Sequence, residues 1–485
     1  MAKVLFIYFD LHSGHSLSFQ HGLASIFGTL RNSNHEVYLR HLSEETDFDS
    51  TINVLESGSY DILALSFTTT QKKYVRVFLD KLKPSSQRII IAGGVHCTIV
   101  KDGVFEEYPM IDGICIGDGE FPLKEMCRRL DANEDILSTP SFNFKSRDKI
   151  IRNPIAPLPG IDELPLPDYS LFNCDKIISQ LGLNYPMMLG RGCPYNCNYC
   201  CNHVIRQVYP EKNTYTRIPS VERSIKIIKN NLSLFAETKK IKFYDETFTL
   251  NRKWLLAFCG EYKKEIGLPF MCDTVFERID DEIAQALKSA GCESINFGLE
   301  TGNEWLRYHI LNRKHSNKKI REVVKVIKRH QIKCFFFNLV GFPFETKEMA
   351  EETLRFNIEL SPDFGTCHYF FPFPGTKLYK LCTDYGLLNE NLGSVSGFFE
   401  EPSLKEVFMT HKEMNKYRES MNALFFMRLL FAKFKIPFLF EKIVLVIIFP
   451  FRKLINSLTL DPRTTNKAII ALRKIMIRLA WKYLR

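Results

Sequence analysis

Short, continuously apolar segments alternate with helix-like segments through the first 130 residues. Strands that are apolar along their whole length suit a sheet covered on both faces, and alternation with helices suits a parallel, doubly wound sheet. The sequence therefore predicts an α/β chain whose residues 1–140 form a Rossmann-like domain. Its expected strands are residues 3–9, 36–42, 61–67, 88–94 and 113–119.

A second series of strand and helix units follows a proline-rich stretch. That stretch, NPIAPLPGIDELPLPDY, interrupts the alternation, and we interpret residues 141–180 as a linker. Six further units predict a complete or partial (β/α)6 barrel over residues 181–385, with its active site at the carboxyl ends of the strands. The expected strands are residues 187–191, 241–247, 270–275, 294–300, 334–342 and 364–371.

Composition narrows the class of protein. Apolar residues make up 45% and charged residues 25% of the 485 residues, as in a chain of several globular domains. The net charge of +10 arises in residues 420–485, which hold thirteen Lys and Arg but two acidic residues. Because the remainder is nearly neutral, the charge does not indicate nucleic-acid binding. The first residues show no signal-peptide pattern, so we expect a cytoplasmic protein.

Four of the fourteen cysteines lie in RGCPYNCNYCCNH, residues 191–203. Cys193, Cys197 and Cys200 have the spacing CxxxCxxC, which could place three buried thiols on one helix face. The glycine, proline and asparagines between them favour a loop instead. This loop follows the first strand of the predicted barrel, which places it on the catalytic face.

A metal centre is the natural occupant of such a loop. Zinc in a structural site takes four ligands, and Cys201 or His203 could complete that set. A four-iron cluster held by three thiolates keeps one iron open for a further ligand. The position on a catalytic face favours the open site.

The CxxxCxxC motif, with the aromatic Tyr199 before its last cysteine, resembles the radical S-adenosylmethionine (radical SAM) superfamily. The resemblance implies a four-iron, four-sulfur cluster on Cys193, Cys197 and Cys200, with S-adenosylmethionine on the open iron. Reductive cleavage would then form a 5′-deoxyadenosyl radical, with electrons from a flavodoxin- or ferredoxin-type donor. By the same resemblance, Cys201 and His203 are not ligands.

Other segments of the barrel resemble this superfamily between about residues 180 and 380. FYDETF, residues 243–248, resembles the second-strand end that meets the methionine amino group. INFGLETGNE, residues 295–304, resembles the fourth-strand segment that approaches the ribose or amino group. The resemblance implies that S-adenosylmethionine contacts Tyr199, Asp245, Glu246 and Glu300.

The first domain resembles that of the cobalamin-binding radical SAM enzymes. Three of its strand ends carry SFTTTQ, GGVHC and GDGE, whose small and polar residues could also be ordinary turns. The resemblance implies cobalamin between the domains. DLHSG after the first strand departs from DxHxxG, so cobalt ligation by His12 stays open. The implied contacts are Ser66, Thr68, Gly93, Gly94, His96, Gly117, Gly119 and Glu120.

The C-terminal region, residues 386–485, is predicted to be helical and basic. Its most apolar stretch, residues 436–451, is too short to span a bilayer. Residues 467–485 form a basic amphipathic pattern that suits either an anionic membrane surface or a helical cap on the barrel. Peripheral membrane contact through residues 420–485 would favour a lipid or lipid-linked substrate.

The leading functional hypothesis is cobalamin-dependent methylation of an unactivated carbon in a natural-product, lipid or cofactor precursor. Relatives with this architecture also carry out cyclisation, rearrangement or oxidation, which is the second hypothesis. A third is a non-catalytic metal-binding protein. The sequence does not identify the substrate.

Overall fold

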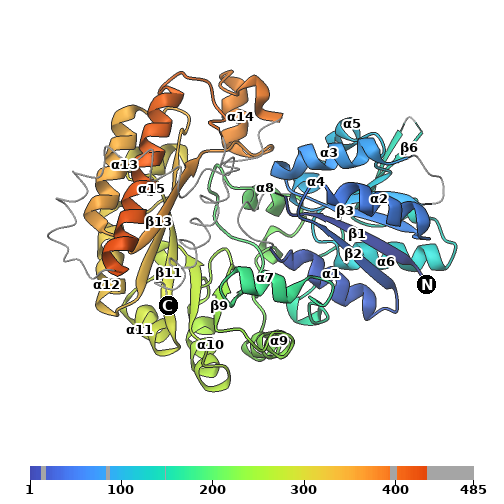
Figure 1. The fold of residues 1–485 in the computed structure, drawn as a ribbon, viewed down its shortest axis with the longest axis horizontal. Helices are drawn as coiled ribbons and strands as arrows, with labels where there is room; N and C mark the ends of the chain where they lie inside the picture. The colour runs from blue at the N-terminus through green and yellow to red at the C-terminus, as the bar shows by residue number, and fades with distance from the viewer. Residues whose placement is uncertain (12–17, 84–87, 148, 394–400, 434–485) are drawn as a thin grey trace.

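The computed structural model describes residues 1–11, 18–83, 88–147, 149–393 and 401–433. Two lobes lie side by side, with the N-terminal sheet domain in one and a curved sheet with its helices in the other (Figure 1). His12 and residues 434–485, which include both apolar and amphipathic segments of the basic tail, lie outside the described residues. None of the helices in the described ranges is long and apolar enough to cross a membrane.

The first sheet has the strand order β2-β1-β3-β4-β5-β6-β7. Its first five strands are parallel, in a doubly wound order that confirms the predicted fold. β6 and β7 add an antiparallel edge, so the sheet extends past residue 140 into the segment expected to be linker. The strands are β1 (Lys3–Phe9), β2 (Glu36–Leu42), β3 (Ile62–Ser66), β4 (Ile89–Gly93), β5 (Gly113–Cys115), β6 (Phe142–Ser146) and β7 (Lys149–Arg152).

Helices cover both faces of this sheet, which explains its apolar strands. In β1, Val4 and Phe6 belong to the core on the α1 and α6 side, while Leu5 and Ile7 belong to the core on the α2 and α3 side. The helices are α1 (His21–Arg31), α2 (Asp47–Ser57), α3 (Lys72–Lys81), α4 (Val95–Val100), α5 (Gly103–Glu107) and α6 (Glu120–Asp131).

The second sheet is a parallel, six-stranded half-barrel with the order β13-β12-β11-β10-β9-β8. Its first strand ends at Met187, earlier than the expected residues 187–191. The chain leaves the ladder there because the Leu189 and Gly190 N–H groups donate to the Asp245 carboxylate. The strands are β8 (Asn184–Met187), β9 (Lys240–Phe243), β10 (Phe270–Thr274), β11 (Cys292–Glu300), β12 (Lys333–Val340) and β13 (Phe364–Tyr369).

The last described helix, α15 (His411–Lys433), covers the open edge of the half-barrel. The Asn422 side chain accepts from the Cys367 N–H at 2.8 Å and donates to its carbonyl at 3.0 Å, so it satisfies edge groups that a further strand would pair. The other helices of this lobe are α7 (Cys174–Gln180), α8 (Asn202–Arg206), α9 (Val221–Leu234), α10 (Arg252–Glu265), α11 (Asp281–Ser289), α12 (Asn317–Arg329), α13 (Lys347–Leu360) and α14 (Lys377–Asp384).

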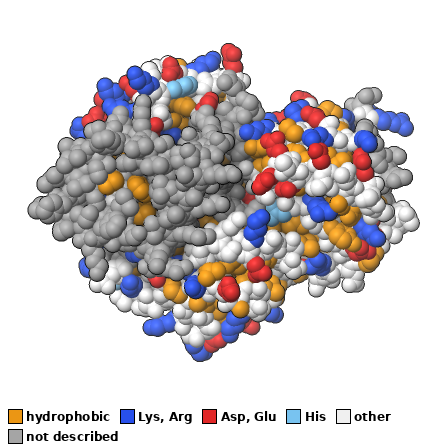
Figure 2. Space-filling view, in the orientation of Figure 1, with side chains coloured by type: hydrophobic (Ala, Val, Ile, Leu, Met, Phe, Trp, Pro, Cys, Tyr) orange, Lys and Arg blue, Asp and Glu red, His pale blue; other side chains and the backbone are white. Residues whose placement is uncertain are grey.

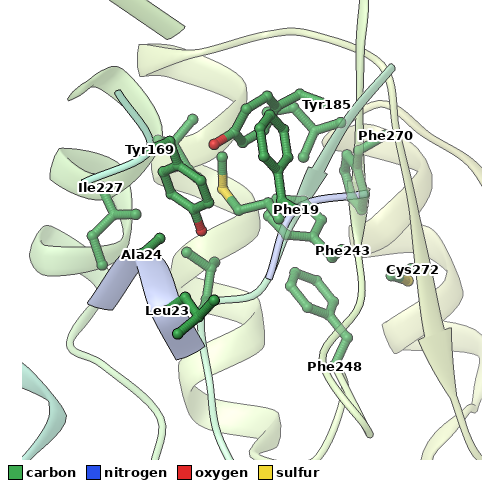
Figure 3. Packing of buried hydrophobic residues seen from close by; sticks show 14 of the residues in the cluster. Phe19, Leu23, Ala24, Tyr169, Tyr185, Ile227, Phe243, Phe248, Phe270 and Cys272 are labelled. Carbon is green, nitrogen blue, oxygen red and sulfur yellow. The ribbon is translucent and has the colours of Figure 1, made fainter. Parts of the chain in front are cut away.

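One apolar core joins the two lobes. Phe19 and Leu23 of the first domain pack with Tyr169, Tyr185 and other residues in a cluster that continues into the half-barrel (Figure 3). The proline-rich segment lies on α1, where the Asp168 N–H donates to the Ala24 carbonyl at 2.8 Å. On the visible described surface, positive and negative side chains are interspersed (Figure 2).

Candidate active site between the two domains

The cysteine loop connects β8 with α8. Cys193, Cys197 and Cys200 are each half-buried and none forms a disulfide. Gly192 adopts a φ of 78°, and a Cβ there would collide with the Tyr215 carbonyl, so the tight turn requires glycine. The loop thus presents its thiols from a compact turn.

Asp245 positions the start of this loop. Its buried carboxylate accepts from the Leu189 N–H at 3.2 Å and the Gly190 N–H at 2.5 Å. Burial raises the pKa of Asp245 to about 7, although both hydrogen bonds oppose the rise. The Asp245 carboxylate thus holds the backbone that leads to Cys193, and its contact with S-adenosylmethionine stays a prediction.

Replacing Asp245 with Asn should loosen this turn. An amide oxygen can replace one acceptor, but the amide NH₂ would face the other N–H, which should cost about 1–3 kcal/mol of stability. The Asp245 carboxyl binds its proton more tightly in the folded than in the unfolded protein. Its proton-linked contribution to the free energy of unfolding is therefore fully present below about pH 4 and is lost as the pH rises through about 7. The free energy of unfolding of the iron-free protein is measured in urea from acidic to mildly alkaline pH. The decrease with rising pH that Asp245 causes in the wild type should be absent in D245N. An unchanged pH dependence in D245N would contradict the assignment.

Glu300, Tyr199 and Arg313 form a polar group beside the loop. The Tyr199 hydroxyl donates to Glu300 Oε1 at 2.9 Å and accepts from Arg313 Nη1 at 2.9 Å. Arg313 Nη1 also lies 4.0 Å from Cys197 Sγ, and its Nε is buried with no hydrogen-bond partner among the described residues. Two predicted residues therefore meet at the loop, with an arginine that the motif comparison did not single out.

The backbone explains how Glu300 reaches this group. Glu300 has a φ of 62° and follows an irregularity in the pairing of β11 with β12. Its carboxylate folds over Gly298, where a Cβ would collide with Oε1. The glycine two residues before the carboxylate in NFGLET is a sequence feature that permits this close approach.

Glu246, which follows β9, and the loop residues Cys201 and His203 also have shifted pKa values. Burial raises the pKa of Glu246, opposed by the Gly192 N–H and the Asn202 side chain. Burial also raises the pKa of Cys201 to about 12 and lowers that of His203. Burial raises the pKa of Cys193, Cys197 and Cys200 as well, so this shift does not distinguish Cys201 from the proposed ligands.

A cavity of about 560 Å³ lies between the domains. One part enters the first domain between its sheet and helices, and is lined by Phe6, Ile91, Cys115 and other apolar residues. The opposite wall belongs to the cysteine loop and its neighbours, including Gly190 and Glu246. The cavity thus connects the first sheet with the start of the cysteine loop.

Six of the eight predicted cobalamin contacts line this cavity, and two do not. Thr68 caps the short helix of residues 69–71. His96 is fully buried, with Nδ1 3.1 Å from Thr69 Oγ1 and Nε2 3.0 Å from Glu107 Oε2. Its imidazole therefore contacts residues inside the first domain and not the cavity. The residues that line the cavity are Ser66, Gly93, Gly94, Gly117, Gly119 and Glu120.

The donor chemistry fits the cofactors that the sequence implies. Within the described residues, no three His, Cys, Asp or Glu side chains converge closely enough to hold one metal ion. A four-iron cluster takes each cysteine on a separate iron, so its thiolates stand apart. At the cavity, a Cβ on Gly93 would meet only the Cβ of Cys115, at 3.7 Å, so this wall leaves room for a ligand.

Family comparisons agree with both halves of the site. The radical SAM superfamily matches residues 187–356, and the B12 binding domain matches residues 15–126. The chain belongs to the cobalamin-binding radical SAM enzymes. Its cofactors are a four-iron, four-sulfur cluster, S-adenosylmethionine and cobalamin.

Two curated relatives illustrate the range of this family. An uncharacterized methyltransferase of Pyrococcus horikoshii is 26% identical over 371 residues, which cover 76% of this chain and 79% of the relative. The anaerobic magnesium-protoporphyrin IX monomethyl ester cyclase of Cereibacter sphaeroides is 26% identical over 314 residues, which cover 62% of this chain and 49% of the cyclase.

Solved structures share the fold across both domains. The radical S-adenosylmethionine methyltransferase TsrM from Kitasatospora setae aligns with a TM-score of 0.66 at 14% identity, covering 85% of this chain and 83% of TsrM. The cobalamin-dependent S-adenosylmethionine radical enzyme OxsB aligns with a TM-score of 0.67 at 16% identity, covering 97% of this chain and 74% of OxsB.

Proposed function

We propose that this enzyme methylates an unactivated carbon of a small molecule. The observation that carries the proposal is the single cavity that joins the glycine-rich strand ends of the first sheet to the start of the cysteine loop. A carbon held at this junction would be within reach of both cofactors. Natural-product, lipid and cofactor precursors are the substrate classes that we consider.

We assign different side chains of the site to the cluster, to cobalamin and to S-adenosylmethionine. Cys193, Cys197 and Cys200 would hold the cluster, while Gly93 would let the first sheet approach cobalamin closely. Glu246 and the group around Arg313 would orient the charged end of S-adenosylmethionine. These roles follow from the donors present and from their positions along the cavity and the loop.

When bound, the cluster and S-adenosylmethionine supply hydrogen abstraction, and cobalamin supplies the methyl group. The cluster requires electrons from outside, so we include a flavodoxin- or ferredoxin-type donor in the proposal. The apolar walls of the cavity would exclude water from the reacting carbon.

Methyl-labelled S-adenosylmethionine tests the reaction directly. The reconstituted enzyme, with cobalamin and a reductant, is incubated anaerobically with a small-molecule extract from cells of the source organism that lack the gene. Mass spectrometry should find a compound carrying one trideuteromethyl group, with equal amounts of 5′-deoxyadenosine and S-adenosylhomocysteine. Substrate-dependent 5′-deoxyadenosine with unlabelled product would contradict methylation.

The similarity to the magnesium-protoporphyrin cyclase favours a second candidate, radical cyclisation or oxidation without methyl transfer. In that case the product should differ from its precursor by hydrogen or oxygen content. The same experiment separates the two candidates because only methylation transfers the label.

A further inference from the structure

Arg191 links the cysteine loop to the first domain. It precedes Cys193 by two residues, and its guanidinium reaches the turn at the end of β5. Nη1 donates to Asp118 Oδ2 at 2.8 Å, while Nη2 donates to Glu120 Oε1 at 2.5 Å and to Ser25 Oγ at 2.8 Å. One side chain of the barrel therefore holds two carboxylates of the cobalamin domain.

A second arginine completes this ion group. The Arg217 Nη2 lies 2.5 Å from Asp118 Oδ2, and its backbone pairs with that of Arg191 in both directions. The Tyr209 hydroxyl accepts from the Asp118 N–H at 2.8 Å. Two guanidinium groups and two carboxylates balance in charge, so the group can be buried without an uncompensated ion.

The two arginines favour the ionised form of Asp118. Burial tends to raise the pKa of Asp118, but Arg191 and Arg217 hold it below its usual range. Glu120 is only 3% exposed and relies on Arg191 as its ion-pair partner. The planar guanidinium can bind both acids at once, which an ammonium group cannot match.

The same residues line the cavity. Asp118 and Glu120 follow Gly117, which adopts a φ of 87°, and all three residues line the cavity together with Arg191. A displacement of the turn at residues 117–120 would therefore pull on the residue two positions before Cys193.

We propose that Arg191 is a positioning residue that couples cobalamin binding to assembly of the cluster. Ordering of the cysteine loop around its cluster fixes Arg191, and Arg191 fixes the turn that borders cobalamin. Cobalamin therefore binds more tightly to the cluster-loaded protein, and the cluster is held more tightly when cobalamin is bound, as thermodynamic linkage requires. The inference rests on the proposed sharing of one cavity by the two cofactors, but not on methyl transfer.

Equilibrium dialysis with hydroxocobalamin measures this coupling. The full chain is compared before and after anaerobic cluster reconstitution, with iron and sulfide quantified in each sample. We expect the reconstituted wild type to bind cobalamin about tenfold more tightly than the iron-free protein, and the ratio to fall to near one in Arg191→Gln. Arg191→Lys keeps the positive charge but loses the planar guanidinium that binds two carboxylates at once, so it should give an intermediate ratio.

Arg223→Gln is the matched control. Arg223 also lines the cavity, but it lies on α9 and donates to the Leu164 carbonyl rather than to the turn at residues 117–120. Its loss can change the absolute affinity for cobalamin, but the ratio between loaded and iron-free protein should persist. A lost ratio in this control would overturn the specific role of Arg191.

Two other results would overturn the coupling. One is a ratio near one in the wild type, and the other is a wild-type ratio in Arg191→Gln. If Arg191→Gln does not fold, the comparison of Arg191→Lys with the wild type decides the question, and an undiminished ratio in Arg191→Lys overturns the inference. Absence of cobalamin binding in every form would contradict the proposed function as well, which separates the two failures.

Discussion

Cys197→Ser should lose the four-iron cluster and all formation of 5′-deoxyadenosine. Each of the three proposed ligands holds a different iron, and a serine hydroxyl is a poor substitute for a thiolate. After anaerobic reconstitution, iron should fall from about four per chain to below about one. Absorbance and electron paramagnetic resonance of the reduced protein should lose the cluster signals.

Cys201→Ala is the matched control for this experiment. Cys201 is the neighbour of Cys200 and a half-buried thiol of the same segment, yet the motif assigns it no iron. Its iron content and 5′-deoxyadenosine yield should match those of the wild type. Equal loss of iron in both variants would point to a four-cysteine site and contradict the open cluster.

Gly93→Leu should block cobalamin while leaving the cluster in place. Gly93 ends β4 at the cavity wall, with an ordinary backbone conformation for a strand. A Cβ there meets only Cys115, so the longer side chain would extend into the space where the cofactor is proposed to bind. We expect at least about a 100-fold loss of affinity, or about 3 kcal/mol, by equilibrium dialysis.

Gly260→Leu makes the same substitution away from the cavity. Gly260 lies on α10, where an added Cβ meets no atom within 4 Å. This variant should bind cobalamin as the wild type does, and both variants should reconstitute the same amount of iron. Wild-type cobalamin binding by Gly93→Leu would place the cofactor elsewhere.

The local patterns were sufficient to predict the architecture. β1 is apolar throughout because both of its faces are covered, and such burial can be inferred from consecutive residues alone. The cysteine spacing is also local and indicated a loop that could hold a metal, while the position of that loop after the first strand of the predicted barrel favoured an open cluster. The end of β8 could not be predicted from the local pattern, because it depends on Asp245, which lies 58 residues after Met187.

The sequence by itself determined the doubly wound domain, the six strand-helix units of a complete or partial barrel, and the cysteine loop after the first of their strands. Only the tertiary structure decided which polar residues face the cavity, because a strand end does not specify where each side chain turns. In the structure, the His96 imidazole points inward and contacts Glu107, and the Asp245 carboxylate accepts from two backbone N–H groups. It also joined Arg191 to Asp118 across 73 residues, since buried charges must find opposite charges wherever the fold brings them together.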